Sequence, residues 1–388
     1  MGAVTGLGLG LVGVAGTGTA AAEPVEKTLK YDCTYPLIGK RTLDLKIKTA
    51  IPKKIKANSE IPTVQVNWDA ALGADTTEGL QAVDGVKIGG TAVANVKLVS
   101  PDDPGGFNVV VDNQLKNTAI PANGGFTIPG YGESIGPEFI KPGSGHVELG
   151  NLALRVTVSK TDGNSSALGT FNAPCTVVAG QDTKLADFEV IDQPVTYDPL
   201  TPKPTWYPET LPKDANPGTL NYAFNLSGES FIKNANGKVP LTGDIKVAVD
   251  GKTGAITGPL NLKKTSGQMS ILGFLPVTAE VDFEQTGPTT GMYANGEIST
   301  TSPMYIKLPS FKVFGAIPIG GGANCKTTEV SQVKLNSPAG KFFNPKTGGT
   351  LATKDYKISA IKDCGPLEGI IGLFASGTGN TIDLNLKP

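Results

Sequence analysis

Runs in which apolar and polar residues alternate one by one most constrain the fold of this chain. Such runs occur at 43–48, 64–68, 152–158, 220–226 and 277–283. Successive side chains of a strand point to opposite faces, so this alternation predicts β-strands that are buried on one side only. Asp-Gly and Asn-Gly pairs, which are typical of hairpin turns, lie between the runs. The chain is therefore predicted to be all-β, with antiparallel strands.

Composition supports the same conclusion. The 388 residues include 50 glycines and 29 prolines, which helix interiors tolerate poorly. Hydrophobic residues make up 39% of the chain, which argues against disorder. We expect only one short helix, near 367–374.

A proline-rich segment at 194–217 holds seven prolines and divides the chain. Proline fixes φ and removes an amide donor, so this segment is predicted to be an extended linker. We expect a signal-peptide remnant at 1–24, an Ig-like β-sandwich domain at 25–193 and a second all-β domain at 218–388. The predicted fold is thus two tandem antiparallel β-sandwich or barrel domains, the first Ig-like. Each is expected to fold alone and to contact the other modestly. The linker's aromatic residues either pin it to one domain or form a ligand for a partner.

The start of the chain indicates export. Residues 1–22 are apolar, small and uncharged, and three alanines (20–22) precede Glu23. This pattern is typical of the later part of a secretory signal peptide, although a disordered Gly/Ala tail is the alternative. No later run is long enough to span a membrane, so no transmembrane anchor is expected in the mature chain.

The four cysteines also favour an oxidising compartment. Cys33, Cys175, Cys325 and Cys364 form no CxxC pair, so a disulfide framework is more consistent with them than a zinc site. Proximity within domains predicts the pairs Cys33–Cys175 and Cys325–Cys364. The expected location is secreted or extracellular, with possible attachment to the cell surface as a further option.

One short motif resembles a hydrolase signature. Residues 132–136 match the GxSxG elbow around Ser134, and His146, the single histidine, lies twelve residues on. In that elbow a serine sits on a sharp turn between a strand and a helix. Flanking prolines and the lack of a following amphipathic helix argue for Gly/Pro-rich loops instead, with His146 leading a strand. If the protein were an esterase, Ser134 and His146 would be its catalytic residues.

A basic stretch near the start of the first domain is the other candidate functional site. It could attract an anionic wall polymer or lipid headgroup, or be a solvated edge strand. The net charge of −1 and the presence of only two arginines argue against nucleic acid as a partner. The basic residues are Lys40, Arg41, Lys46, Lys48, Lys53, Lys54 and Lys56.

Metal and cofactor chemistry find little support. One histidine excludes a multi-histidine site, and the aspartates lack calcium-loop spacing. We therefore predict no metal and no cofactor. Two apolar stretches, 271–277 and 370–374, belong either to the core or to an apolar cleft for a lipid-like ligand.

The first domain resembles a secreted actinobacterial domain family of unknown function. The resemblance covers 27–193 and rests on 29–33 (LKYDC), 51–52 (IP), Cys175 and 180–182 (GQD). It implies an Ig-like fold and an extracellular location.

The second domain is similar to small secreted actinobacterial proteins, some of which carry a cholesterol esterase label. The residues that carry the similarity are 227–230 (SGES), 273–277 (GFLPV) and 325–328 (CKTT). The label implies hydrolysis of a sterol or lipid ester. This domain has no histidine and no GxSxG, so it cannot assemble an ordinary Ser-His pair by itself.

Together these features predict a secreted or cell-envelope-associated binding or structural protein without catalytic activity. Its expected partner is an anionic cell-wall polymer, a lipid or another surface protein. The alternative is a secreted esterase that acts on sterol or lipid esters.

Overall fold

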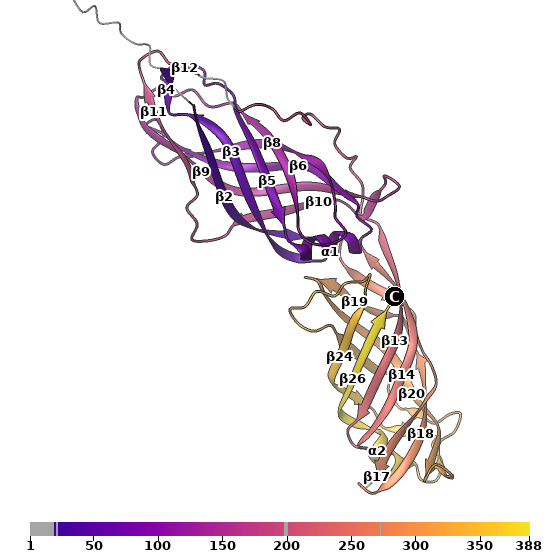
Figure 1. The fold of residues 1–388 in the computed structure, drawn as a ribbon. Coiled ribbons are helices and arrows are strands. Elements are labelled where there is room, and N and C mark those ends of the chain that lie inside the picture. Colours follow the sequence, from indigo (N-terminus) through magenta and orange to yellow (C-terminus); the bar gives the residue numbers. More distant parts are fainter. Residues whose placement is uncertain (1–18, 21, 198–200, 272) are drawn as a thin grey trace, which may run out of the picture.

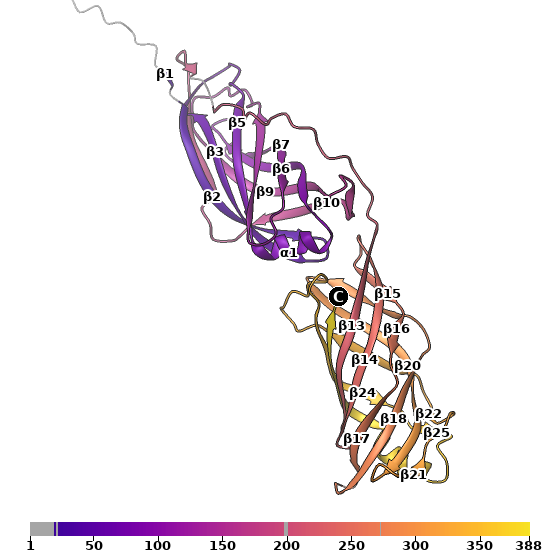
Figure 2. The same ribbon diagram turned by 45° about the vertical axis from the view of Figure 1, so that its right-hand side comes forward.

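The computed structural model describes residues 19–20, 22–197, 201–271 and 273–388. Its strands form two large sheets, one on each side of the proline-rich segment, and the two lie end to end (Figures 1 and 2). The prediction of two tandem, largely antiparallel β-domains is confirmed. The expected signal-peptide remnant lies mostly outside the described residues. A separate parallel pair joins β1 (Thr19–Ala20) to β12 (Thr196–Tyr197).

The first sheet is a closed barrel. β10 pairs with both β2 and β9, so eight strands form a ring in the order β10-β2-β3-β5-β8-β7-β6-β9. The Ig-like arrangement expected here, with two separate sheets, is not observed. Closure removes the strand edges that a sandwich leaves open. The strands are β2 (Ala22–Tyr35), β3 (Gly39–Pro52), β5 (Val64–Leu72), β6 (Lys87–Val99), β7 (Phe107–Ala119), β8 (Phe126–Ser134), β9 (Gly143–Ser159) and β10 (Ser165–Val177).

Three further elements complete this domain. β11 (Lys184–Ile191) pairs with β9, and β4 (Lys54–Lys56) adds to β11 in parallel. The helix α1 (Ala74–Ala82) covers the end of the barrel that faces the second sheet (Figure 1). The sequence did not indicate α1, because its apolar residues are few. It packs closely all the same, since a Cβ at Gly79 would lie 2.7 Å from the Ile38 side chain.

The join between β10 and β2 is short and covalently reinforced. Only three residue pairs link the two strands, and one of them is Cys175 opposite Cys33. These cysteines form a disulfide, and Cys325 and Cys364 form the other. The predicted pairing is the one the structure contains. The first bond therefore holds the barrel closed at one of its weakest joins.

Replacing both Cys33 and Cys175 by serine should destabilise the first barrel strongly. In the chain-entropy model the 142-residue separation of this pair corresponds to about 5 kcal/mol, against about 4 kcal/mol for the 39-residue separation of Cys325 and Cys364. Urea unfolding of the two double variants, followed by circular dichroism, measures the difference. An equal or smaller loss for the Cys33–Cys175 variant would contradict the role assigned to this join.

The second sheet surrounds a core of its own. β13 pairs with both β26 and β14, so the main strands of this sheet also form a closed ring, here called the second barrel. Two joins of the ring, β14–β17 and β23–β24, each consist of one residue pair. The predicted short helix is confirmed as α2 (Glu368–Ala375). The strands are β13 (Thr219–Ile232), β14 (Gly237–Asp250), β15 (Ala255–Gly258), β16 (Leu260–Leu262), β17 (Thr265–Ile271), β18 (Leu275–Gln285), β19 (Thr289–Ala294), β20 (Glu297–Val313), β21 (Ile317–Gly320), β22 (Lys326–Thr327), β23 (Ser331–Asn336), β24 (Gly349–Ile358), β25 (Ile361–Lys362) and β26 (Gly377–Lys387).

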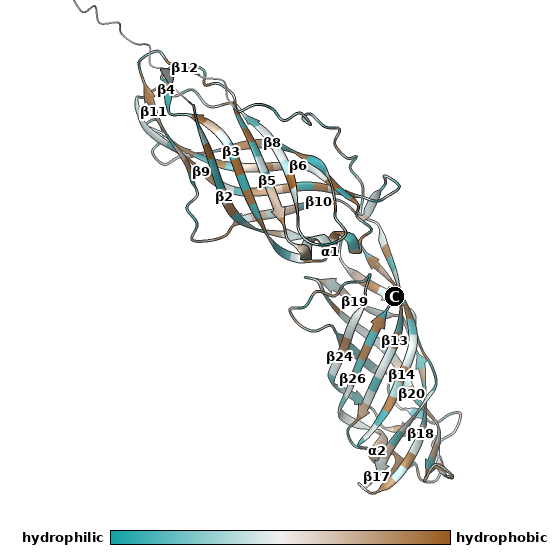
Figure 3. Ribbon diagram, viewed as in Figure 1, coloured by the Kyte–Doolittle hydropathy of each residue, from teal (hydrophilic) through white to brown (hydrophobic). Residues whose placement is uncertain are grey.

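Strands of both sheets show the alternation on which the sequence analysis rested (Figure 3). On β3, for example, Leu43, Leu45 and Ile47 are buried, while Asp44, Lys46 and Lys48 face outward and are only partly buried or exposed. Apolar surface removed from water in this way is the main stabilising term of such a domain.

The two barrels share a buried cluster at their junction. The Tyr222 hydroxyl donates a hydrogen bond to the Ala82 carbonyl (2.8 Å), and the Gly296 amide donates to the Leu37 carbonyl (2.8 Å). The junction is therefore closer than the modest contact that the sequence analysis expected. Its buried apolar residues include Leu37, Ile38, Leu80 and Val83 from the first barrel and Leu220, Val249, Ile256 and Tyr293 from the second.

The described part of the proline-rich segment lies along the outside of the first barrel. The Tyr207 ring packs on Tyr131 with centroids 4.5 Å apart, and Arg155 binds Asp214 at 2.6 Å. Lys203 binds Glu133 at 2.7 Å, and the Tyr131 hydroxyl donates to the same carboxylate at 2.6 Å. The expectation that the aromatic residues pin the segment to one domain is confirmed for Tyr207.

The attachment of the proline-rich segment to Glu133 should weaken in acid. The hydrogen bond from Lys203, followed by that from Tyr131, holds the pKa of Glu133 below its ordinary value of 4.5. A lowered pKa stabilises the attached state above the ordinary value, and this stabilisation is lost as pH falls through the lowered pKa. Limited proteolysis of the segment should therefore speed up as pH falls below the ordinary carboxyl value of 4.5 and through the lowered pKa of Glu133. The variant Glu133→Gln should remove that pH dependence, and an unchanged acid response in it would contradict the assignment.

Candidate ligand cavity of the first barrel

The first barrel encloses an apolar cavity of about 130 Å³. It extends from the middle of the barrel toward the end away from the second sheet, where Ile55, Ile61, Phe139 and Phe188 line it. Only three of its lining side chains carry a nitrogen or oxygen outside a tryptophan ring: Thr49, Asn113 and Ser134. The cavity can therefore accept an apolar group at little desolvation cost.

Trp68 and Asn113 form the polar feature of this wall. The indole Nε1 donates to Asn113 Oδ1 at 2.9 Å, and Asn113 Nδ2 donates to the Val111 carbonyl at 2.8 Å. Gly130 makes room for the indole, because a Cβ there would lie 2.1 Å from the ring. The pair is buried and hydrogen-bonded, so it stiffens the wall, and both residues line the cavity.

The strands of the wall beside this pair are only partly hydrogen-bonded to each other. β7 and β8 pair only through residues 113–115 and 130–132. Beyond that point Val109 and Val111 on one side, and Ser134 and Gly136 on the other, all line the cavity. The β7–β8 join lacks strand pairing on both sides of these three residue pairs, and its part toward the far end of the barrel borders the cavity.

Asp102 holds the loop that follows β8, an interaction here called the strap. From the turn between β6 and β7, its carboxylate accepts hydrogen bonds from the amides of Ile140 (2.7 Å) and Lys141 (3.1 Å). These residues follow Phe139, whose side chain lines the cavity and whose carbonyl accepts a bond from the Asn58 amide (2.8 Å). The loop 135–142 therefore forms a lid that one carboxylate and one backbone bond hold in place.

Asp102→Asn should loosen this lid. One of the two charge-assisted hydrogen bonds loses its acceptor, which costs about 1–2 kcal/mol locally. Hydrogen exchange of the Ile140 and Lys141 amides should speed up by about tenfold or more. The control is Asp103→Asn, because the Asp103 carboxylate accepts only from the nearby Gly105 amide. Unchanged exchange in Asp102→Asn, or equal effects of both variants, would contradict the strap.

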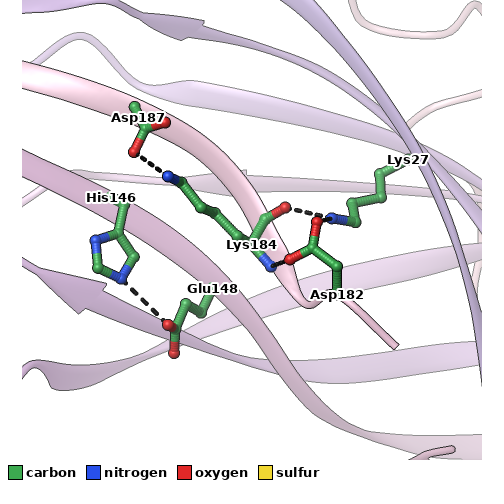
Figure 4. Close-up of polar contacts among 6 residues, drawn as sticks. All are labelled: Lys27, His146, Glu148, Asp182, Lys184 and Asp187. Atoms are coloured by element: carbon green, nitrogen blue, oxygen red, sulfur yellow. Dashed lines mark hydrogen bonds and ion pairs between the residues drawn. The ribbon is translucent and has the colours of Figure 1, made fainter. Parts of the chain in front are cut away.

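The structure does not bring Ser134 and His146 together. Ser134 ends β8 and lines the cavity, while His146 lies in β9 and faces outward, so the expected Gly/Pro-rich loop around Ser134 is in part a strand. Two strands, β7 and β6, separate them, which corresponds to about 14 Å along the wall. Figure 4 shows His146 bound instead to Glu148, at 3.1 Å on the same strand.

The basic stretch is largely neutralised by its neighbours. Antiparallel pairing places carboxylates of β2 and β5 beside the lysines of β3. The Lys40 ammonium holds the pKa of Asp32 below its usual value, and Lys46 does the same for Glu26. The pairs are Lys40–Asp32 (2.6 Å), Arg41–Asp75 (2.9 Å), Lys46–Glu26 (2.5 Å), Lys48–Asp69 (3.4 Å) and Lys53–Glu23 (2.6 Å); Lys54 and Lys56 lie on β4.

The cavity lies within a region that matches known sequences. Residues 30–186 match a family of unknown function (DUF6801). The DUF6801 region spans nearly all of the barrel, from β2 into β11, and includes every cavity residue named above except Phe188. Comparison with curated proteins and with solved structures gave no match.

The described residues contain no cluster of three or more His, Cys, Asp or Glu side chains placed to hold a metal ion. No helix among them is long and apolar enough to cross a membrane.

Sequence reasoning missed Trp68, Asn113 and Asp102 as functional residues. A usable signal existed for Asn113, because the alternation of Val109, Val111 and Leu115 places it at an inward position where a polar residue needs a partner. No such signal exists for Asp102, since its contacts lie 38 and 39 residues away in the chain.

Proposed function

We propose that this is an exported binding protein whose first barrel holds a small apolar ligand or the apolar end of a lipid. The observation that carries the proposal is the apolar cavity of about 130 Å³ beside the unpaired part of the β7–β8 join. Eight-stranded barrels are just wide enough to hold one small ligand when side chains do not fill them.

The lining defines the ligand class. Aliphatic side chains from β3, β5, β6, β7 and β9 surround the cavity, so each methylene group transferred from water is stabilised by about 0.8 kcal/mol. The volume is of the order of the roughly 150 Å³ apolar cavity known to bind benzene. The cavity therefore suits a ring or a short aliphatic segment, with a polar end directed toward Ser134 and the lid.

Export is supported by the two disulfides, which persist in oxidising compartments. We place the protein outside the cell or at the cell envelope. Catalysis is not part of the proposal, because Ser134 and His146 lie on strands separated by two others and face opposite sides of the wall.

Trp68 provides a direct test. The chain has two tryptophans, so Trp206→Phe leaves Trp68 as the only indole, and it lines the cavity. Titration with dodecanoic acid and with benzene should change its fluorescence saturably. Ala94→Leu, which fills the cavity, should weaken binding by about tenfold or more, equivalent to about 1.4 kcal/mol.

The matched control is Ala375→Leu, which fills the separate cavity of the second barrel. It should leave the Trp68 response unchanged. Thermal unfolding of each variant checks that the barrels remain folded. A Trp68 signal that does not saturate, or that Ala94→Leu leaves intact, would overturn the proposal.

A further inference from the structure

The end of the second barrel away from the first carries an unusual concentration of exposed apolar side chains. Of the twelve large hydrophobic residues that are exposed in the described part of the chain, six lie here. They belong to the β17–β18 turn, the β20–β21 turn and the segment around α2, which the views place at this end (Figures 1 and 2). They are Phe274, Phe314, Ile317, Leu367, Ile370 and Leu373.

Contacts between these elements make them one surface, here called the apolar tip (271, 273–277, 313–324 and 365–376). The Phe314 amide donates to the Pro276 carbonyl at 3.0 Å, which joins the two hairpin turns. The Gly321 amide donates to the Cys364 carbonyl at 3.0 Å, and a Cβ on Gly320 would lie 2.4 Å from Ile371. The Cys325–Cys364 disulfide braces the base of the tip.

The helix α2 shows that this surface needs a cover. Ile371 and Ala375 form its buried face, yet Ile370 and Leu373 on the other side are also apolar and are 51% and 69% exposed. A helix with apolar side chains on opposite sides is normally covered on both of them, by protein or by lipid. Exposed apolar patches of this kind mark interaction surfaces.

The charges around the tip favour a lipid surface as the cover. The 30 described residues of the tip contain one ionisable side chain, Glu368, whose carboxylate accepts a bond from the Cys364 amide (3.0 Å). Lys312 immediately precedes the second tip segment, and Lys362 lies shortly before the third. Lys233 lies in a turn beside the tip, because the side-chain amide of its neighbour Asn234 donates to the Ser376 carbonyl (2.7 Å). The ion pairs found among the described residues of the second sheet use other lysines. Asp363 and Glu368 lie beside these ammonium groups in the chain, and Glu280, which binds Lys264 at 2.9 Å, also lies near Lys312.

We infer that the apolar tip inserts into the surface of a lipid bilayer, with Lys233, Lys312 and Lys362 facing anionic headgroups. The apolar side chains project from two turns and one helix, so they can enter a fluid layer without a matching pocket. Membrane binding of this kind grows with buried apolar area and with attraction to anionic lipid. The inference concerns the second barrel and does not depend on a ligand in the first.

Vesicle flotation of the full chain tests it. The protein should float with vesicles of phosphatidylcholine, and more strongly when phosphatidylglycerol is added. The triple variant Phe274→Ser, Phe314→Ser and Leu373→Ser should lower the partition coefficient by at least about tenfold. All three side chains are exposed, so the fold should remain intact, which thermal unfolding checks.

The matched control replaces three exposed apolar residues elsewhere, Val110, Met292 and Leu211, by serine. It should bind vesicles like the unmodified chain. A chain with Ala94→Leu should also float normally, so failure of the cavity proposal and failure of this one are distinguishable. The inference is overturned if no vesicle binds, or if both triple variants bind equally. It is also overturned if sedimentation velocity shows that the tip variant breaks a dimer, since the cover would then be a second copy.

Discussion

The closure of β10 onto β2 and β9 is the constraint on which the first domain depends. Without it the eight strands would form an open sheet with two exposed edges, and the apolar faces of β3, β5 and β9 would not enclose a common interior. The join to β2 has only three residue pairs, and the Cys33–Cys175 bond stabilises it. Once the ring is closed, its interior must be filled by side chains, and where they leave space a cavity results.

The join between β7 and β8 is as short as the join between β10 and β2, since each has three residue pairs. The cavity lies beside the part of the β7–β8 join that continues beyond these pairs toward the far end of the barrel. The Trp68–Asn113 hydrogen bond stiffens one side of this opening, while Asp102 holds the lid across its end. A weakly paired part of the wall thus borders the apolar cavity, which is an arrangement that suits ligand entry.

The junction between the barrels is also held by the burial of apolar side chains. α1 covers one end of the first barrel, and apolar residues of both sheets meet beside it in one buried cluster. The far end of the second barrel has apolar residues of the same kind and no protein to cover them among the described residues. The two ends of that barrel therefore differ in what covers them, and this difference underlies the proposed contact with lipid.

Much of the fold could be predicted from the sequence by itself. Alternation at 43–48 and 277–283 predicted strands, and the proline-rich segment predicted a division into two sheets. The placement of two cysteines on each side of that segment favoured the two bridges that the structure contains. These are local properties, because a strand's period and a proline's fixed φ do not depend on distant residues. Only the tertiary structure decided that the first sheet closes as a barrel, that Asp102 straps residues 140–141, and that the lysines of β3 meet carboxylates on β2 and β5. Each of these depends on strand order and register, which bring together residues far apart in the chain and which no local pattern encodes.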